Sequence, residues 1–266
     1  MAIASRAARQ AKLHRDRPGL LAWFWLVVVA GYFILPLIAM GMFSFWAGGS
    51  NYNFSAYVAL FQDGDMWRSL TLSLRLAVET IVITQVLLIP TVLFVSLRAP
   101  KLRLVLEMIS NMPFVVPAIV LVAGLSALYR GPSWFVSSPE FMIPGYVILA
   151  LPYTYRALDV GVQALDVKTL TQAGLSLGAS WTQIFLRVII PNLRSAIIGS
   201  TLLMLAIVLG EFTFANVLLF NTFAVYINYI GQTSGTEAAA LSLFSFLFTW
   251  LAMLGIMITG AKRGGR

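Results

Sequence analysis

Six apolar runs, nearly free of charge, dominate the pattern of hydrophobic and polar positions along the chain. They cover residues 19–46, 70–97, 105–128, 142–155, 195–220 and 238–261. An α-helix needs about 20 apolar residues to cross a bilayer, so each run is predicted to be a transmembrane helix. The fourth run is short and contains Pro144 and Pro152, which leaves five spans as the alternative count.

The composition agrees with this pattern. Hydrophobic residues make up 59% of the chain and charged residues 11%, whereas soluble domains carry about 25% charged residues. The predicted fold class is an all-α polytopic membrane protein, with a six-helix transmembrane domain at residues 19–261 between basic tails at 1–18 and 262–266. The first run exceeds the roughly 7–15 residues of a signal-peptide core, so we expect it to be an uncleaved span.

Lysine and arginine are distributed unevenly between the two sides of the predicted bundle. With six spans, fifteen of the eighteen basic residues fall on one side, and such residues are enriched on the cytoplasmic side of membranes. We therefore expect a multi-pass protein of a prokaryotic inner membrane with both termini in the cytoplasm. Because the net charge of +8 is placed at the ends of apolar runs, it indicates contact with membrane lipid and no nucleic-acid partner.

Residues that carry catalytic chemistry are scarce. The chain has no cysteine, and its one histidine, His14, lies in the basic tail and is expected to be solvated. The sequence contains no serine–histidine–carboxylate set, no HExxH helix and no GxxxxGK(S/T) phosphate loop. We therefore expect no catalytic residue, no metal site and no bound cofactor, and the chain is not predicted to be an enzyme.

A patterned segment, residues 166–191, stands where a short connection between the fourth and fifth spans is expected. Asp166 can cap a first helix whose apolar positions recur every three or four residues and so share one face. These positions are Val167, Leu170, Ala173, Gly174 and Leu177. Gly178 follows, at the place where helices commonly end in a left-handed residue. The segment is predicted to begin with a short amphipathic helix and a sharp turn.

A second helix is predicted after that turn. Ser180 and Gln183 form a capping-box pattern, and the apolar stripe that follows consists of Trp181, Ile184, Phe185, Val188 and Ile189. Pro191 lacks an N–H and is expected to interrupt or kink this helix before span five. Such a pair of helices can lie in the lipid headgroups or dock a partner. The small residues Ala173 and Gly174 favour docking, because they allow a close approach.

The stretch QAGLSLGASWTQIFLRVIIP resembles the coupling-loop motif of type I ABC importer permeases. That motif is Glu-Ala-Ala, three residues, Gly, nine residues, Ile, any residue, Leu-Pro. Its positions are occupied here by Gln172, Ala173, Gly174, Gly178, Val188, Ile190 and Pro191. The lead-in ALDVKTLTQAGLSLGASW and the triplet GEF at residues 210–212 are most similar to the permeases of polyamine, phosphonate and ferric-iron importers.

This resemblance implies half of a translocation pathway for a small polar solute. The implied partners are two copies of a cytoplasmic ABC ATPase, a second permease, identical or homologous, and an extracytoplasmic solute-binding protein. ATP is then used by the partner ATPase, and the segment 166–191 is the coupling loop. Because Gln172 replaces a glutamate of the motif, a neutral hydrogen bond should replace a charge-assisted one, a change of about 1 kcal/mol.

The charged residues inside the predicted spans include Arg75, Glu79 and Glu211. Arg75 and Glu79 are four residues apart on the second span and can pair along one helix face. Glu211 has no charged neighbour at three or four residues' distance, so it is expected to face the pathway or a backbone partner. Glu79 and Glu211 are the candidate pathway residues. The alternative function is an ion-coupled secondary transporter that uses these two acids, although no internal repeat is evident.

Overall fold

Helices make up nearly all of the ordered structure. The computed structural model describes residues 19–129 and 131–262. This part of the chain contains no β-strand, and an isolated bridge joins Trp46 to Tyr52. The prediction of an all-α membrane fold is confirmed. The tail 1–18, which includes His14, and residues 263–266 lie outside the described residues.

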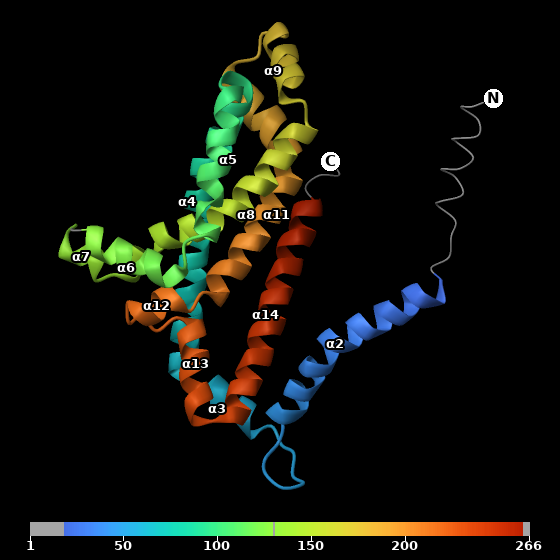
Figure 1. Ribbon diagram of the computed structural model, residues 1–266, viewed down its shortest axis with the longest axis vertical. Helices are drawn as coiled ribbons and strands as arrows, with labels where there is room; N and C mark the ends of the chain where they lie inside the picture. Colours follow the sequence, from blue (N-terminus) through green and yellow to red (C-terminus); the bar gives the residue numbers. More distant parts are fainter. Residues whose placement is uncertain (1–18, 130, 263–266) are drawn as a thin grey trace.

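The long helices form an elongated bundle (Figure 1). They are α2 (Leu20–Ser44), α4 (Gly64–Arg98), α8 (Ile143–Ala164), α11 (Ile190–Gly210) and α14 (Gly235–Lys262). In the described part, four helices are long and apolar enough to cross a membrane, and five are if a bent pair counts as one span. Helix α8 is not among them, because its second half carries Arg156 and Asp159. A count of six spans therefore stays a prediction.

The bent pair consists of α5 (Arg103–Asn111) and α6 (Ala118–Leu128), with the 3₁₀ turns η1 (Pro100–Leu102) before α5 and η2 (Met112–Phe114) after it. The segments on either side of the break meet at 103°. Pro113 lies in η2 and Pro117 is the extended N-cap residue of α6, and neither can donate the N–H that a continuous helix needs. The broken third run therefore follows from its two prolines.

Three helices differ in extent from the predicted apolar runs. Helix α4 begins at Gly64 instead of residue 70, because the Asp63 side chain accepts a hydrogen bond from the Asp65 N–H at 2.8 Å and caps the helix. Helix α8 continues beyond residue 155 to Ala164. Helix α11 ends at Gly210 instead of continuing to residue 220, because the next residue has an extended backbone with ψ 119°.

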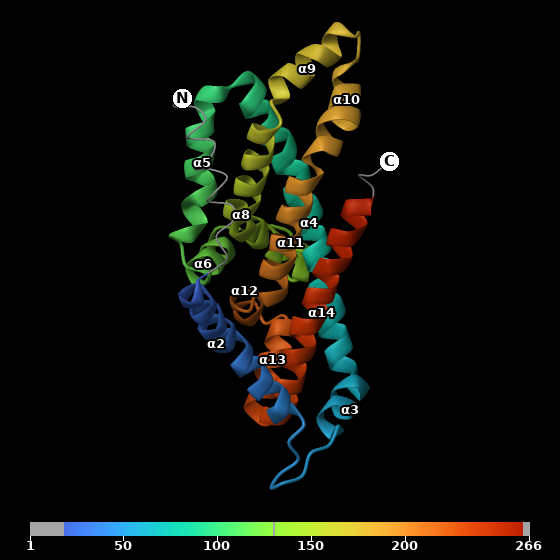
Figure 2. The same cartoon turned by 90° about the vertical axis from the view of Figure 1, so that its right-hand side faces the viewer.

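The centre of the bundle is a core in which α8 packs against both α4 and α11. Its buried side chains include Leu76, Tyr146, Leu205 and Phe214. At one end of the bundle lie α3 (Ser55–Gln62) and α13 (Phe223–Thr233), with α12 (Thr213–Val217) nearer the centre (Figure 2). The short elements α7 (Ser133–Val136) and η3 (Pro139–Met142) follow α6.

Helix α2 stands apart from the bundle. It packs against α14, and Figure 1 shows its N-terminal end diverging from the other helices. None of its most apolar 18-residue window is buried. Its exposed side chains are large and apolar, among them Trp23, Phe24 and Phe33. This helix therefore leaves an apolar surface that the described chain does not cover.

Candidate functional site

The segment between α8 and α11 forms a helix, a tight turn and a second helix at the end of the bundle opposite α3 (Figure 2). The first helix is α9 (Val167–Ser176), and the Asp166 side chain accepts a hydrogen bond from the Thr169 N–H. Gly178 has φ +78°, and a Cβ placed there would meet nothing within 4 Å. Glycine is required at this turn by its left-handed backbone and not by lack of space.

The second helix begins with the predicted capping box. The Gln183 N–H donates to Ser180 Oγ at 3.3 Å, and the Ser180 N–H donates to Gln183 Oε1 at 2.9 Å. Helix α10 (Trp181–Ile184) follows, then a π-helical turn η4 (Phe185–Ile189), and then α11 without a break. The capping-box prediction is confirmed. The turn and the second helix therefore continue directly into a long apolar helix of the bundle.

Of the two outcomes expected at Pro191, an interruption of the helix is wrong, because the helix continues through this residue, and a kink stays a prediction. A proline in a helix leaves an earlier carbonyl without its N–H partner and pushes against it. Here the turn before Pro191 widens to a π-helix, and the Asn192 side chain donates to the Val188 carbonyl at 2.7 Å. The helix passes through the proline, so a movement of α10 can be transmitted to α11.

The two helices of this coupling segment, residues 166–191, pack against each other. Val167 and Thr171 of α9 are buried, and Ile184 of α10 is fully buried. A Cβ at Gly174 would lie 2.8 Å from Ile184 Cγ1. The pattern of small residues predicts a close approach by a docking partner at Gly174. The side chain that approaches is instead Ile184 of the same segment, so this prediction is wrong at Gly174.

The other side of α9 is uncovered. Gln172, Ala173 and Gly178 are exposed, and Leu177, between α9 and the turn, is 87% exposed. Leu175 is also exposed. In Figure 2 this part of α9 lies at the extreme end of the molecule. The coupling segment therefore presents a small apolar tip, Ala173, Leu175 and Leu177, on a frame held by internal packing.

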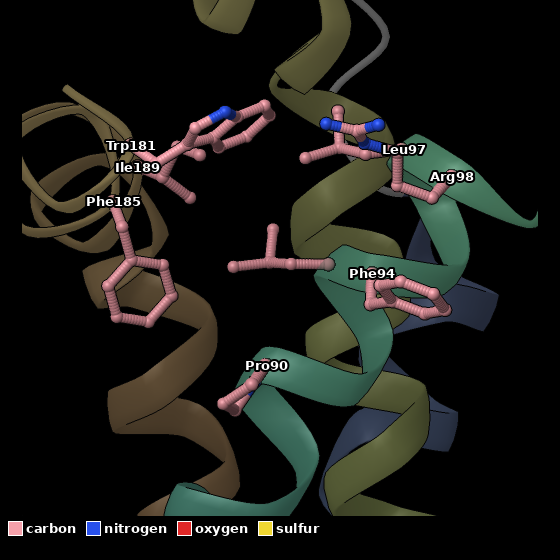
Figure 3. Close-up of a pocket in the computed structure, with 8 residues that line it drawn as sticks. Pro90, Phe94, Leu97, Arg98, Trp181, Phe185 and Ile189 are labelled. Atoms are coloured by element: carbon pink, nitrogen blue, oxygen red, sulfur yellow. The ribbon is translucent and has the colours of Figure 1, made fainter. Parts of the chain in front are cut away.

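A groove runs along the base of this tip (Figure 3). It encloses about 720 Å³ and is lined by Pro90, Leu93, Phe94, Leu97 and Arg98 of α4 and by Trp181, Phe185 and Ile189 of α10 and η4. The Arg98 guanidinium lies 5.2 Å from the centroid of the Trp181 ring, a cation–π contact. The apolar stripe predicted for the second helix includes Trp181, Phe185 and Ile189, whereas its contact with α4 is not predictable from periodicity.

An ion pair that the sequence analysis did not identify lies beneath the coupling segment. Arg103 of α5 binds Asp159 of α8 in a bidentate manner, with Nε–Oδ1 3.1 Å and Nη2–Oδ2 2.9 Å. Gln163 donates to the same carboxylate at 2.7 Å. The Asp159 side chain is 7% exposed and that of Arg103 44%. The sequence signal that could have predicted this pair was the spacing of Asp159 and Gln163, four residues apart on α8. The connection between α4 and α5, which carries Arg103, supplies the basic partner.

The predicted pair of Arg75 and Glu79 is present, with Nε–Oε1 3.6 Å. Arg75 also binds Glu140, which belongs to η3, so the arginine joins α4 to that outer connection. The pKa of Glu140 is held below its ordinary value by its own backbone N–H, by Ser138 and by Arg75. Glu79 Oε2 is buried without a hydrogen-bond partner among the described residues.

Glu211 lies at the break between α11 and α12. Its side chain is almost completely buried, and both carboxylate oxygens accept the Phe214 N–H, at 3.1 and 3.0 Å. Of the two expectations for Glu211, the structure shows a backbone partner, and the carboxylate caps the first turn of α12. The pathway role of Glu79 and Glu211 stays a prediction.

Comparisons with known proteins agree with this geometry. The family model described as "binding-protein-dependent transport system inner membrane component" matches residues 89–260, which include the coupling segment. No curated protein sequence matches the chain.

Solved structures show the same fold. A bacterial ABC transporter that imports the acidic polysaccharide alginate is 16% identical, with 98% of this chain and 99% of that chain covered and a TM-score of 0.69. A bacterial alginate ABC transporter in complex with a periplasmic protein is 18% identical, with coverage of 92% and 95% and a TM-score of 0.69.

An amino acid ABC transporter with histidines is also 18% identical, with coverage of 78% and 94% and a TM-score of 0.51. At these identities the structures show the fold alone. The family model, by contrast, covers well over half of the sequence. The chain therefore belongs to the binding-protein-dependent transport system inner membrane components, the transmembrane permeases of ABC importers.

Proposed function

We propose that this permease forms half of the translocation pathway for a small polar solute and is driven by an ABC ATPase that docks on the coupling segment. One observation carries the proposal. The coupling segment is fixed by a capping box, by the contact of Gly174 with Ile184 and by the turn at Gly178, yet its tip is apolar and uncovered. A rigid element with an exposed apolar tip is suited to a protein partner.

The continuous helix gives the docked ATPase a mechanical connection to the bundle. Helix α10 and η4 run directly into α11, and α11 packs against α4 and α8 in the central core. Gln85 of α4 strengthens this contact, because its side-chain amide donates to Ser200 Oγ of α11 at 2.7 Å. A displacement of the tip would therefore move α11 and its neighbours together.

The turn at Gly178 provides the test. A left-handed backbone costs a β-branched residue about 1–2 kcal/mol, whereas asparagine adopts it more readily. Gly178→Val should therefore reduce both co-purification of the ATPase and ATP-driven uptake, and Gly178→Asn should retain most of both. Because a Cβ meets nothing within 4 Å at this position, the two variants differ mainly in backbone strain. Equal and full ATPase binding by both variants would contradict docking at this turn.

The remaining partners are proposals supported by less direct observations. The uncovered surface of α2 agrees with a second permease, identical or homologous. The alginate transporter in complex with a periplasmic protein supports an extracytoplasmic binding protein. The fifteen basic residues on one side support a cytoplasmic position for both termini and for the coupling segment.

The solute is proposed to be of the polyamine, phosphonate or iron type, on the resemblance of residues 164–181 and of GEF at 210–212. Glu79 and Glu211 are the proposed pathway residues. Glu211→Gln keeps an oxygen that can accept the Phe214 N–H but removes the charge. It should therefore lower uptake at unchanged assembly with the ATPase, whereas unchanged uptake would leave Glu211 with the capping role alone. Membership of the permease family replaces the ion-coupled alternative.

A further inference from the structure

The groove between α4 and the α10–η4 helix is apolar along its walls and polar at one end. Docking of a soluble ATPase does not explain this distribution. The walls of the groove are apolar over the whole length from Pro90 to Leu97 on one side and from Phe185 to Ile189 on the other. Polar chemistry is confined to one end, where Arg98 and the Trp181 indole meet. Figure 3 shows this guanidinium reaching toward the indole ring at one end of the groove.

Arg98 lies at the end of α4 with its charge unneutralised within the described chain. The ion pairs there do not include Arg98, and the one acid of the coupling segment, Asp166, accepts hydrogen bonds from Thr169. The guanidinium carbon of Arg98 lies 5.2 Å from the centroid of the Trp181 ring. Guanidinium N–H groups can bind phosphate oxygens in a bidentate manner.

The groove also extends along a helix, α4, that is long and apolar enough to cross a membrane. Eight residues separate Pro90 from Arg98, which corresponds to about 12 Å along a helix. The groove therefore extends from the charged end of α4 into its apolar run. The α10–η4 wall departs from regular α-helix geometry at the π-turn η4, and such turns are frequent at functional sites.

We propose that this groove binds an anionic phospholipid of the leaflet that faces the coupling segment. An acyl chain would lie between Leu97 and Phe185, and the phosphate would be bound by the in-plane N–H groups of Arg98. Trp181 is the first residue of α10 and Arg98 is the last of α4. A lipid held at their contact would fix the angle of the coupling segment relative to α4. The proposal goes beyond ATPase docking. It rests on the proposed function only in the cytoplasmic position of the coupling segment.

The test measures which lipids stay bound to the purified permease–ATPase complex. The complex is reconstituted in nanodiscs of equimolar phosphatidylglycerol and phosphatidylcholine, and the retained lipids are counted by native mass spectrometry. The wild type should retain phosphatidylglycerol preferentially. Arg98→Gln should lower this preference about fivefold, the effect of one basic residue at an anionic surface. The matched control is Arg187→Gln, because Arg187 is an exposed arginine on η4 outside the groove lining.

A second variant tests the apolar part of the groove. Leu97→Trp fills the groove without changing charge, so it should lower retention of both lipids.

Equal losses in the two arginine variants, or no preference in the wild type, would overturn the proposal. Lipid retained by the permease alone but lost in the permease–ATPase complex would assign the groove to the ATPase, and displacement by inorganic phosphate would assign it to a free anion. Co-purification of the ATPase is measured in the same samples, so a failure of docking and a failure of lipid binding are distinguishable.

Discussion

Two glycines four residues apart in the coupling segment are needed for different physical reasons. Gly178 supplies a left-handed backbone in open space, whereas Gly174 supplies the room that Ile184 occupies. The sequence identified both as motif positions, and the position of Gly178 after a helix was enough to predict its role. The role of Gly174 depends on a contact between two helices, which periodicity within one helix does not reveal.

A size exchange tests the role of Gly174. Gly174→Leu places side-chain atoms where Ile184 already lies, and overpacking of this kind costs about 1–3 kcal/mol. We expect faster amide hydrogen exchange in α9 and α10. Adding Ile184→Ala to this variant should restore part of the protection, because it vacates the space. If the single variant exchanges like the wild type, or the second change gives no rescue, Gly174 does not pack on Ile184.

The ion pair of Arg103 and Asp159 makes a second prediction at this scale. Arg103→Gln leaves a nearly buried carboxylate with Gln163 as its remaining partner. The cost should be about 1–2 kcal/mol, below that of a fully buried pair because Arg103 is itself partly exposed. Arg68→Gln is the control, since its pair with Asp65 is exposed on both sides and should contribute little. Equal thermal unfolding of the two variants would contradict this assignment.

At the scale of the elements, prolines mark the places where a helix can break, but not every proline breaks its helix. Pro113 and Pro117 break the third run, as the lack of an N–H predicts. Pro191 does not break its helix, because a π-turn and the Asn192 side chain accommodate it. The end of α11 at Gly210 was missed, since the apolar run continues through it while the backbone turns to let Glu211 cap α12.

The contact between α4 and α13 predicts a dependence on pH. Tyr226 donates to Asp63 Oδ2 at 2.5 Å, and this bond, with the Asp65 N–H, holds the pKa of Asp63 below its ordinary 3.8. Because the folded pKa is the lower one, the carboxylate stabilises the fold above pH 3.8. That contribution is lost as the pH falls through the folded pKa.

Tyr226→Phe should therefore lower the unfolding temperature near neutral pH, and its difference from the wild type should shrink in acid. The control is Tyr229→Phe, which changes an exposed tyrosine of the same helix. Thermal unfolding at neutral and acidic pH measures both differences. A Tyr226→Phe difference that does not change with pH would show that the charge of Asp63 is not involved.

For the whole molecule, the class follows from the apolar runs, and the family resemblance follows from the spacing of the coupling segment. The groove at Arg98, the link from Arg103 to Asp159 and the link from Arg75 to Glu140 join residues more than fifty positions apart in the chain. None of these three contacts could be predicted from the sequence pattern, because the packing of one helix on another decides which side chains meet. The number of spans also depends on whether α8 crosses the membrane, because its second half carries Arg156 and Asp159.

The central claim is that the tip of the coupling segment docks an ABC ATPase. The chain has no cysteine, so Leu177→Cys introduces its one thiol at a residue that is 87% exposed. Leu87→Cys is the control, placed on an exposed face of α4 within the apolar run. A thiol-to-amine crosslinker is applied to membranes that contain the permease and its ATPase, and the products are identified by mass. We predict a permease–ATPase product for Leu177→Cys and none for Leu87→Cys. Failure of Leu177→Cys to crosslink while the ATPase still co-purifies would contradict docking at this tip.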